Sequence, residues 1–208
     1  FVLQAVVGGI TVLAGLAWWT VSLHFLVSPL LVWLAVLVLR AVDEGDAPAR
    51  PLIPQALRWL LVAQTGVLIA LLIAGTLVTA AGPHSGDART PRLQVPVSTL
   101  AQLHADLMFT FLGSVAAFGF ALRITGASKP LWRRYFWLVG LVVAQGALGI
   151  TQYFLGVPEV LVSLHVLGAI CVVIATATLW AASRDRGERP TTSAQPVVED
   201  RAPEYTGG

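Results

Sequence analysis

The sequence predicts an all-α protein, a polytopic bundle of transmembrane helices. Its 208 residues are 56% hydrophobic and only 12% charged, whereas soluble domains usually carry about 25% charged residues. The apolar residues occur in blocks of about 20, which is the length that a helix needs to cross the hydrocarbon core of a bilayer. The apolar blocks make the lipid bilayer the partner that composition predicts. The net charge of +2 gives no indication of nucleic-acid binding.

Six apolar blocks define the expected helices. They cover residues 1–17, 19–41, 57–81, 97–123, 132–155 and 159–182. Together they form one transmembrane domain over 1–183, and the polar, proline-rich segment 184–208 is expected to be a disordered tail. Phe1 already lies in an apolar stretch, so we expect the chain to start partway through a longer protein. The single cysteine, Cys171, lies in an apolar run and leaves no disulfide within the chain.

The basic residues divide the loops into two sets. Of the thirteen, Arg89 and Arg92 lie in the loop at 82–96, and the other eleven lie in three segments, 40–58, 123–134 and the tail from 184. Because cytoplasmic loops carry an excess of lysine and arginine, the three segments and the C-terminus are predicted to be cytoplasmic. The loops at 16–19, 82–96 and 156–159 then face outward across the plasma membrane.

Two helix pairs in the sequence resemble each other. Residues 9–24 read GITVLAGLAWWTVSLH and residues 149–165 read GITQYFLGVPEVLVSLH, so the second segment has one more residue between the shared ends. Gln4 precedes the first histidine by the same distance along the chain as Gln145 precedes the second. Helices one and two therefore look like a duplicate of helices five and six, which is common in membrane folds. If the repeat unit has four helices, two further helices precede Phe1.

Three of the four histidines are predicted to lie at the same depth. His24 and His165 come about six residues after the outward end of their helices, and His104 comes about seven residues after, which is roughly 9–11 Å at 1.5 Å per residue. An ionisable side chain at that depth is costly without a partner. A shared layer of cofactor sites explains the arrangement.

Haem iron suits these histidines. A neutral imidazole binds a metal through one ring nitrogen, and a haem takes axial ligands from opposite sides of its ring, as facing helices can supply. Small residues beside the histidines would let a flat macrocycle approach. They are Gly168 and Ala169, one turn after His165, and Ala101, one turn before His104. Zinc would prefer a tetrahedral set with cysteine or carboxylate. The alternative is that each histidine only hydrogen-bonds a neighbouring helix.

Other polar residues have weaker indications. His84, in the outer-loop sequence GPHSGD, is as consistent with a solvated or loop-shaping role as with a functional one. Arg89 and Arg92 lie on the face where haem propionates would emerge, although solvation of the loop also accounts for them. Asp106 is two residues after His104 and so points to another side of the helix.

The chain resembles the haem A synthase family in its actinobacterial form. The segments that carry the resemblance are VGGITVLAGL, VSLHFLVSP, GTLVTAAGPHSGD, LAQLHADLMF and QGALGITQYFLGVPEVLVSLHVLGA. It extends over residues 1–183. Members of that family have eight helices in two four-helix halves related by a pseudo-twofold axis, and the six helices here resemble the last six.

The resemblance implies a function. The family oxidises a methyl group of haem O to the formyl group of haem A, which is used in cytochrome oxidase. By analogy His104 and His165 hold a haem b, and His24 is one axial ligand of the substrate haem. The second ligand of that haem, and a glutamate used in the reaction, would lie on a helix absent from this chain. Haem O synthase and cytochrome oxidase assembly factors are the implied protein partners.

Two other classes of function stay open on the sequence. One is a non-catalytic b-type cytochrome that transfers electrons, and the other is a transporter or assembly scaffold. Transmembrane electron carriers usually stack haems at two depths, and all three histidines here are predicted at one. Transporters usually surround a midplane site with a pair of helices broken by proline or glycine, and the sequence has no such pair, although Pro29 could kink the second helix.

Overall fold

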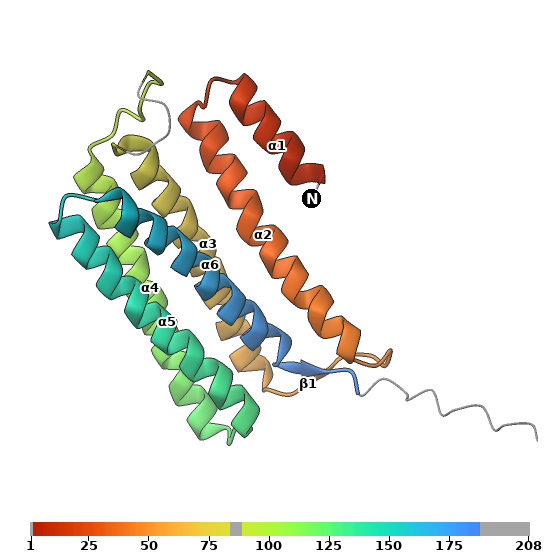
Figure 1. Cartoon of the computed structure of the whole chain (residues 1–208). Helices are drawn as coiled ribbons and strands as arrows, with labels where there is room; N and C mark the ends of the chain where they lie inside the picture. The colour runs from red at the N-terminus through yellow and green to blue at the C-terminus, as the bar shows by residue number, and fades with distance from the viewer. Residues whose placement is uncertain (1, 84–88, 188–208) are drawn as a thin grey trace, which may run out of the picture.

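The computed structural model of the chain is an all-helical bundle, and it describes residues 2–83 and 89–187 (Figure 1). Within these residues there are six helices and two short strands. In chain order they are α1 (Val2–Leu13), α2 (Trp18–Asp43), β1 (Arg50–Pro51), α3 (Gln55–Ala81), α4 (Val97–Ile124), α5 (Lys129–Phe154), α6 (Glu159–Ala181) and β2 (Arg184–Asp185). The helices α2 to α6 are long and apolar enough to cross a membrane. A helical bundle with five potential membrane spans is thereby confirmed.

The long helices begin and end within three residues of the predicted positions. Pro54, Pro96 and Pro158 directly precede α3, α4 and α6. Proline lacks the amide hydrogen that a helix interior needs, and it is therefore tolerated at a helix start and excluded from most interior positions. These residues separate the apolar blocks and made their boundaries predictable.

The first predicted span is wrong in length. The sequence predicted a helix over 1–17, but α1 ends at Leu13 and has 12 residues, or about 18 Å at 1.5 Å per residue. A bilayer core is about 30 Å thick. The helix stops because Gly15 and Leu16 both adopt positive φ, 66° and 56°, which lies outside the right-handed helical region. The described residues therefore contain five spans of sufficient length, not six.

A four-helix core forms the centre of the bundle. Helix α3 packs against α4, α5 packs against α6, and α2 lies along α6 and α3, with α1 folded back on α2 (Figure 1). The fully buried side chains come mainly from the four helices α3 to α6, and include Leu61, Phe111, Phe118, Leu138 and Leu179. In α2, only Thr20 and Pro29 are buried. The α1–α2 hairpin is thus an appendage with most of its apolar surface open to the surroundings.

The connections gather at two ends of the bundle (Figure 1). We call one the histidine end, formed by residues 14–17, 89–96 and 155–158, because His24, His104 and His165 lie near it. We call the other the basic end, formed by residues 44–54, 125–128 and 182–187. This division is the same as the one that the charge distribution of the loops predicts.

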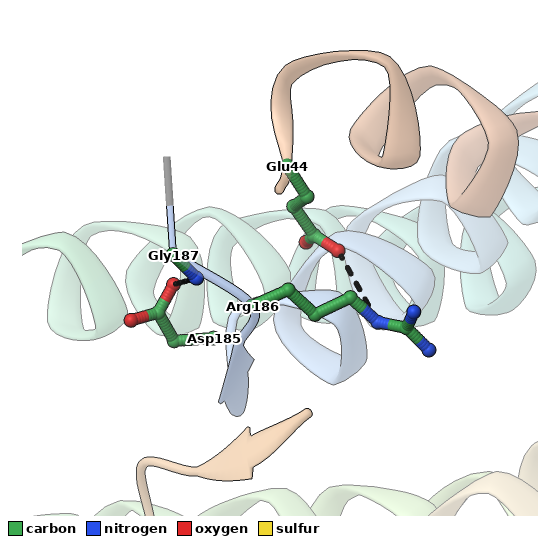
Figure 2. Close-up of polar contacts among 4 residues, drawn as sticks. All are labelled: Glu44, Asp185, Arg186 and Gly187. Carbon is green, nitrogen blue, oxygen red and sulfur yellow. Dashed lines mark hydrogen bonds and ion pairs between the residues drawn. The ribbon is translucent and has the colours of Figure 1, made fainter. Parts of the chain in front are cut away.

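The start of the predicted tail is ordered by a contact with the first loop of the basic end. Strand β2 pairs with β1 in antiparallel register, with Arg184 opposite Pro51. Arg186 Nε lies 4.0 Å from Glu44 Oε2, and the amide of Gly187 donates to Asp185 Oδ1 at 2.9 Å (Figure 2). Residues 184–187 were predicted to be disordered and instead close the basic end. The rest of the predicted tail, 188–208, lies outside the described residues.

Gly119 on α4 gives room to the Tyr135 side chain of α5, and it provides a test of the core packing. A methyl group added there would overlap the Tyr135 hydroxyl. We expect Gly119→Ala to lower the free energy of unfolding by about 1–3 kcal/mol, as overpacked cores do. Gly113→Ala on the same helix meets no neighbouring atom within 4 Å and should be neutral or slightly stabilising. Thermal unfolding in one detergent compares them, and equal midpoints would contradict the packing.

Candidate functional site

His104 and His165 face each other between α4 and α6. Their ring centroids are 6.3 Å apart and the ring planes are inclined by 69°. The helix positions in the sequence predicted a common depth for these residues, and the family resemblance predicted their pairing. His24, on α2, is not part of the pair, and the three histidines therefore divide into a facing pair and a single residue.

The separation of the pair matches two ligands on opposite sides of one metal ion. A histidine nitrogen binds a metal at about 2.0–2.1 Å, and a ring nitrogen lies about 1.1 Å from its own centroid, which gives about 6.3 Å between centroids for opposite ligands. Haem iron accepts two axial ligands in this way. The pair therefore fits a haem iron by distance.

The hydrogen bond of His104 determines which of its nitrogens is free. Nδ1 lies 3.1 Å from the carbonyl oxygen of Leu71 on α3. Because a carbonyl only accepts, Nδ1 carries the proton and Nε2 keeps the lone pair that binds a metal. Metal-binding histidines commonly donate their second nitrogen to a carbonyl, which fixes the orientation of the ring. The Nδ1 atoms of His24 and His165 are buried without a partner, so among the three this anchor is specific to His104.

A glycine lies against each of the three histidine rings. A methyl group added at Gly8, Gly75 or Gly149 would lie 3.0, 3.1 or 3.2 Å from the Cε1 atom of His24, His104 or His165, respectively. Each glycine is on the helix that precedes its histidine in the chain. The sequence reasoning did not single out these glycines, although Gly8 and Gly149 precede their histidines by equal distances along the chain.

This contact corrects the alignment of the repeat. A single offset in residue number relates Gly8 to Gly149, and the same offset relates Gln4 to Gln145, Gly15 to Gly156 and His24 to His165. The offset between the two Gly-Ile-Thr triplets is one residue shorter. Aligning those triplets is therefore out of register and requires an insertion that the structure does not contain. The match of Gly-Ile-Thr is a coincidence of sequence.

The two turns repeat the same conformation in this register. The Leu16 amide donates to the Thr11 carbonyl at 3.0 Å, and the Val157 amide donates to the Gln152 carbonyl at 2.7 Å. Leu16 and Val157 are also the two non-glycine residues with positive φ among the described residues, at 56° and 61°. A valine rarely adopts that conformation, so its recurrence indicates that both hairpins need this turn.

A cavity of about 280 Å³ adjoins the histidine pair. Helices α2 to α6 all contribute to its wall, which is mostly apolar and includes the polar residues His104, His165, Gln145 and Gln152. Mostly apolar walls with a few polar groups are typical of small-molecule and cofactor sites. Ala169 also lines the cavity, as its predicted role beside the macrocycle requires, whereas Ala101 does not belong to the lining.

Gly168, predicted to lie beside the macrocycle, contacts Gln145. A methyl group added there would overlap the amide nitrogen of Gln145, so the absence of a side chain makes room for Gln145. The equivalent Gln4 donates to the His24 carbonyl at 3.2 Å and to the Ser28 hydroxyl at 2.7 Å. Ala169 replaces that serine in the second hairpin. The Oε1 atoms of both glutamines are buried without a partner.

The remaining candidate residues have other contacts or lie outside the described residues. Arg92 donates to the carbonyls of Gly82 and Pro83, both at 3.0 Å, and so shapes the loop. Arg89 belongs to the same connection. Asp106 accepts a bond from Gln102 at 2.7 Å on the exposed side of α4, and His84 lies outside the described residues.

The described part of the chain contains no group of three or more histidine, cysteine or acidic residues that could hold a metal ion. A haem needs only two protein ligands, so its site is not of that kind. Compared with models of known families, curated proteins and solved structures, the chain finds no match. The site must be interpreted from its own geometry.

The two glutamines provide a test of the repeat. Gln4→Leu removes two hydrogen bonds between helices, each worth about 0.6 to 2 kcal/mol in a membrane protein, and should lower the unfolding midpoint. Gln145→Leu removes an amide that forms no hydrogen bond within the described part of the chain and whose oxygen is buried, so it should be neutral or stabilising. Thermal unfolding of the haem-free protein measures both, and a larger loss at Gln145 would show that the hairpins differ in another way.

Proposed function

We propose that this chain binds a haem b through His104 and His165 and that it is part of a haem A synthase, which oxidises the methyl group of haem O to a formyl group. The chain itself holds one of the two ligands of the substrate haem, His24. The facing pair of imidazoles beside an apolar cavity is the observation that carries the haem site. The assignment of the reaction rests on the resemblance of the sequence segments that contain the three histidines.

Each protein group has a defined task in this proposal. His104 would bind the iron through Nε2, because its Nδ1 donates to the Leu71 carbonyl, and that bond would make the imidazole a better donor to the metal. His165 on α6 would be the second ligand. A bound haem would supply the electron transfer, while the protein holds it, sets its potential and keeps water away.

His24 is the ligand assigned to the substrate haem. Its ring packs on Gly8 as the ring of His165 packs on Gly149. The α1–α2 hairpin therefore presents a histidine in the same local arrangement as the α5–α6 hairpin, at a separate position. A duplicated site with separate haems is what an enzyme needs if one haem passes electrons to or from another. The eight-helix arrangement of two four-helix halves belongs to this proposal, with α3 to α6 as one half.

Orientation and location follow from the same proposal. The excess of arginine at the basic end supports a cytoplasmic position for that end, and the histidine sites then lie near the outer surface of the plasma membrane. Haem O synthase and cytochrome oxidase assembly factors are the partners that a haem A synthase would require.

A b-type cytochrome without enzyme activity is the second candidate. One observation favours it: a haem with two imidazole ligands has no open coordination position, which is typical of electron transfer and not of oxygen binding. In that case His24 has no haem to hold. The two candidates therefore make different predictions for this residue.

Histidine variants test the haem site. We expect His104→Ala and His165→Ala each to lose haem b from the purified protein, because a lost ligand costs more than the roughly 10–100-fold that a lost hydrogen-bond partner of a ligand typically costs. His24→Ala serves as the control and should keep that haem. The reduced-minus-oxidised absorption spectrum is the measurement, and full haem content in both of the first two variants would refute the site.

Addition of haem O then separates the enzyme from the cytochrome. The wild-type chain should take up haem O in addition to haem b, and His24→Ala should fail to do so, as measured by extracting and quantifying both haems after gel filtration. If wild type and His24→Ala take up equal amounts, the cytochrome is the better description.

Glycine variants test the contact between the helices and the ring. Gly149→Ala places a methyl group 3.2 Å from His165 Cε1, which must tilt the imidazole or move the helix. We expect affinity for haem to fall by about tenfold, which corresponds to about 1.4 kcal/mol. Gly140→Ala on the same helix has no neighbour within 4 Å and should bind haem as the wild type does. Haem titration followed by absorbance compares the two, and equal affinities would show that the contact is not needed.

A further inference from the structure

A second cavity lies at the basic end, away from the histidines. It encloses about 260 Å³ between the start of α3, the loop at 49–51 and the end of α6. Its polar rim includes Gln55, Arg58, Ser183 and Arg184. We call it the basic groove.

Arg58 and Arg184 supply uncompensated positive charge to the basic groove. Neither side chain forms a hydrogen bond or ion pair within the part of the chain that the structure describes, and Arg184 Nε is buried without a partner. Their neighbour Arg186 points to Glu44 instead (Figure 2). A buried guanidinium nitrogen without an acceptor is costly, so an anion in the groove would satisfy it.

The pairing of β1 with β2 holds Arg184 at the groove. Pro51 is its partner in the ladder, and the Leu52 amide donates to the Ser183 carbonyl at 2.9 Å. Arg58 comes from the first turn of α3, which contains no acidic residue. The two guanidinium groups thus approach the groove from different elements that are fixed to each other.

The other side of the groove is apolar and runs along two potential membrane spans. Trp59, Leu61 and Val62 of α3 and Trp180 of α6 form it. Trp59 is 64% exposed, so it offers a free aromatic face. Trp180 is held by an edge-to-face contact with Trp33 of α2, with ring centroids 6.0 Å apart.

The surroundings of the groove are positive as well. Among the described residues, the basic end and the adjoining helix turns carry nine basic side chains against four acidic ones. The basic residues are Arg40, Arg50, Arg58, Arg123, Lys129, Arg133, Arg134, Arg184 and Arg186, and the acidic residues are Asp43, Glu44, Asp46 and Asp185. This excess attracts anionic groups at a membrane surface.

We propose that the basic groove binds an anionic phospholipid. Arg58 and Arg184 hold the phosphodiester of the headgroup, and one acyl chain lies along Trp59 and Val62. The combination of charge at the aqueous rim and an apolar wall inside the spans selects a lipid over free phosphate, which would contact only the rim. The site is independent of the haem proposal, since none of its residues line the histidine cavity.

Lipid-dependent stabilisation tests the site. The full chain is purified in detergent, and its unfolding midpoint is measured with phosphatidylglycerol, with phosphatidylcholine of the same acyl chains, and with inorganic phosphate at equal ionic strength. We expect a higher midpoint with phosphatidylglycerol than with the other two. Arg58→Gln/Arg184→Gln should weaken the apparent affinity for phosphatidylglycerol by roughly tenfold, as the loss of charge-assisted hydrogen bonds predicts.

The matched control is Arg123→Gln/Arg133→Gln, which removes two charges from the same end outside the groove and should leave the lipid effect unchanged. Quenching of tryptophan fluorescence by brominated phosphatidylglycerol, compared in wild type and Trp59→Phe, gives a second readout that needs no arginine variant. The proposal would be overturned if both double arginine variants lost the same affinity for phosphatidylglycerol. It would also be overturned if inorganic phosphate stabilised the protein as much as the lipid does, or if the fluorescence quenching did not depend on Trp59.

Discussion

The close approach of a histidine ring to the backbone of a neighbouring helix is the constraint on which the rest of this structure depends. In a bundle of apolar helices, small residues let helices pack closely, and here Gly8, Gly75 and Gly149 each give that room to an imidazole. Each ring thus packs directly on the backbone of the helix that precedes its own. A polar, ionisable group is thereby fixed at a defined depth in surroundings that would otherwise disfavour it.

The helical hairpin that contains this contact occurs twice, and its two copies have diverged where they face different surroundings. The Gln4 amide nitrogen donates to the His24 carbonyl and to the Ser28 hydroxyl. Gln145 has Ala169 in the place of that serine, contacts Gly168 and borders the cavity of the four-helix core. The two glutamines therefore differ in their surroundings: Gln4 bonds within its own helix pair, and Gln145 lines the cavity.

Much of the fold was predictable because apolar block length, loop charge and proline position are local properties of the sequence. The common depth of His104 and His165 was predictable from their similar distances to the helix starts. The length of α1 was not, because the break at Gly15 and Leu16 interrupts an apolar run without a polar signal. The register of the repeat was also missed, since the identity of Gly-Ile-Thr outweighed the spacing of the glycines that contact the rings. The bond from His104 to Leu71 has no sequence signal at all, because its acceptor is a backbone carbonyl.

The two ends of the bundle separate two kinds of electrostatics. His24 and Arg40 are on one helix and are separated by about 24 Å along its axis at a rise of about 1.5 Å per residue, which exceeds the screening length of about 8–10 Å at an aqueous surface. At the histidine end, Arg92 is engaged by the carbonyls of Gly82 and Pro83. The arginines of the basic end are therefore far from the histidines, and they act on the aqueous surroundings of that end. The fold thus keeps its excess of positive charge apart from the histidine pair and its cavity.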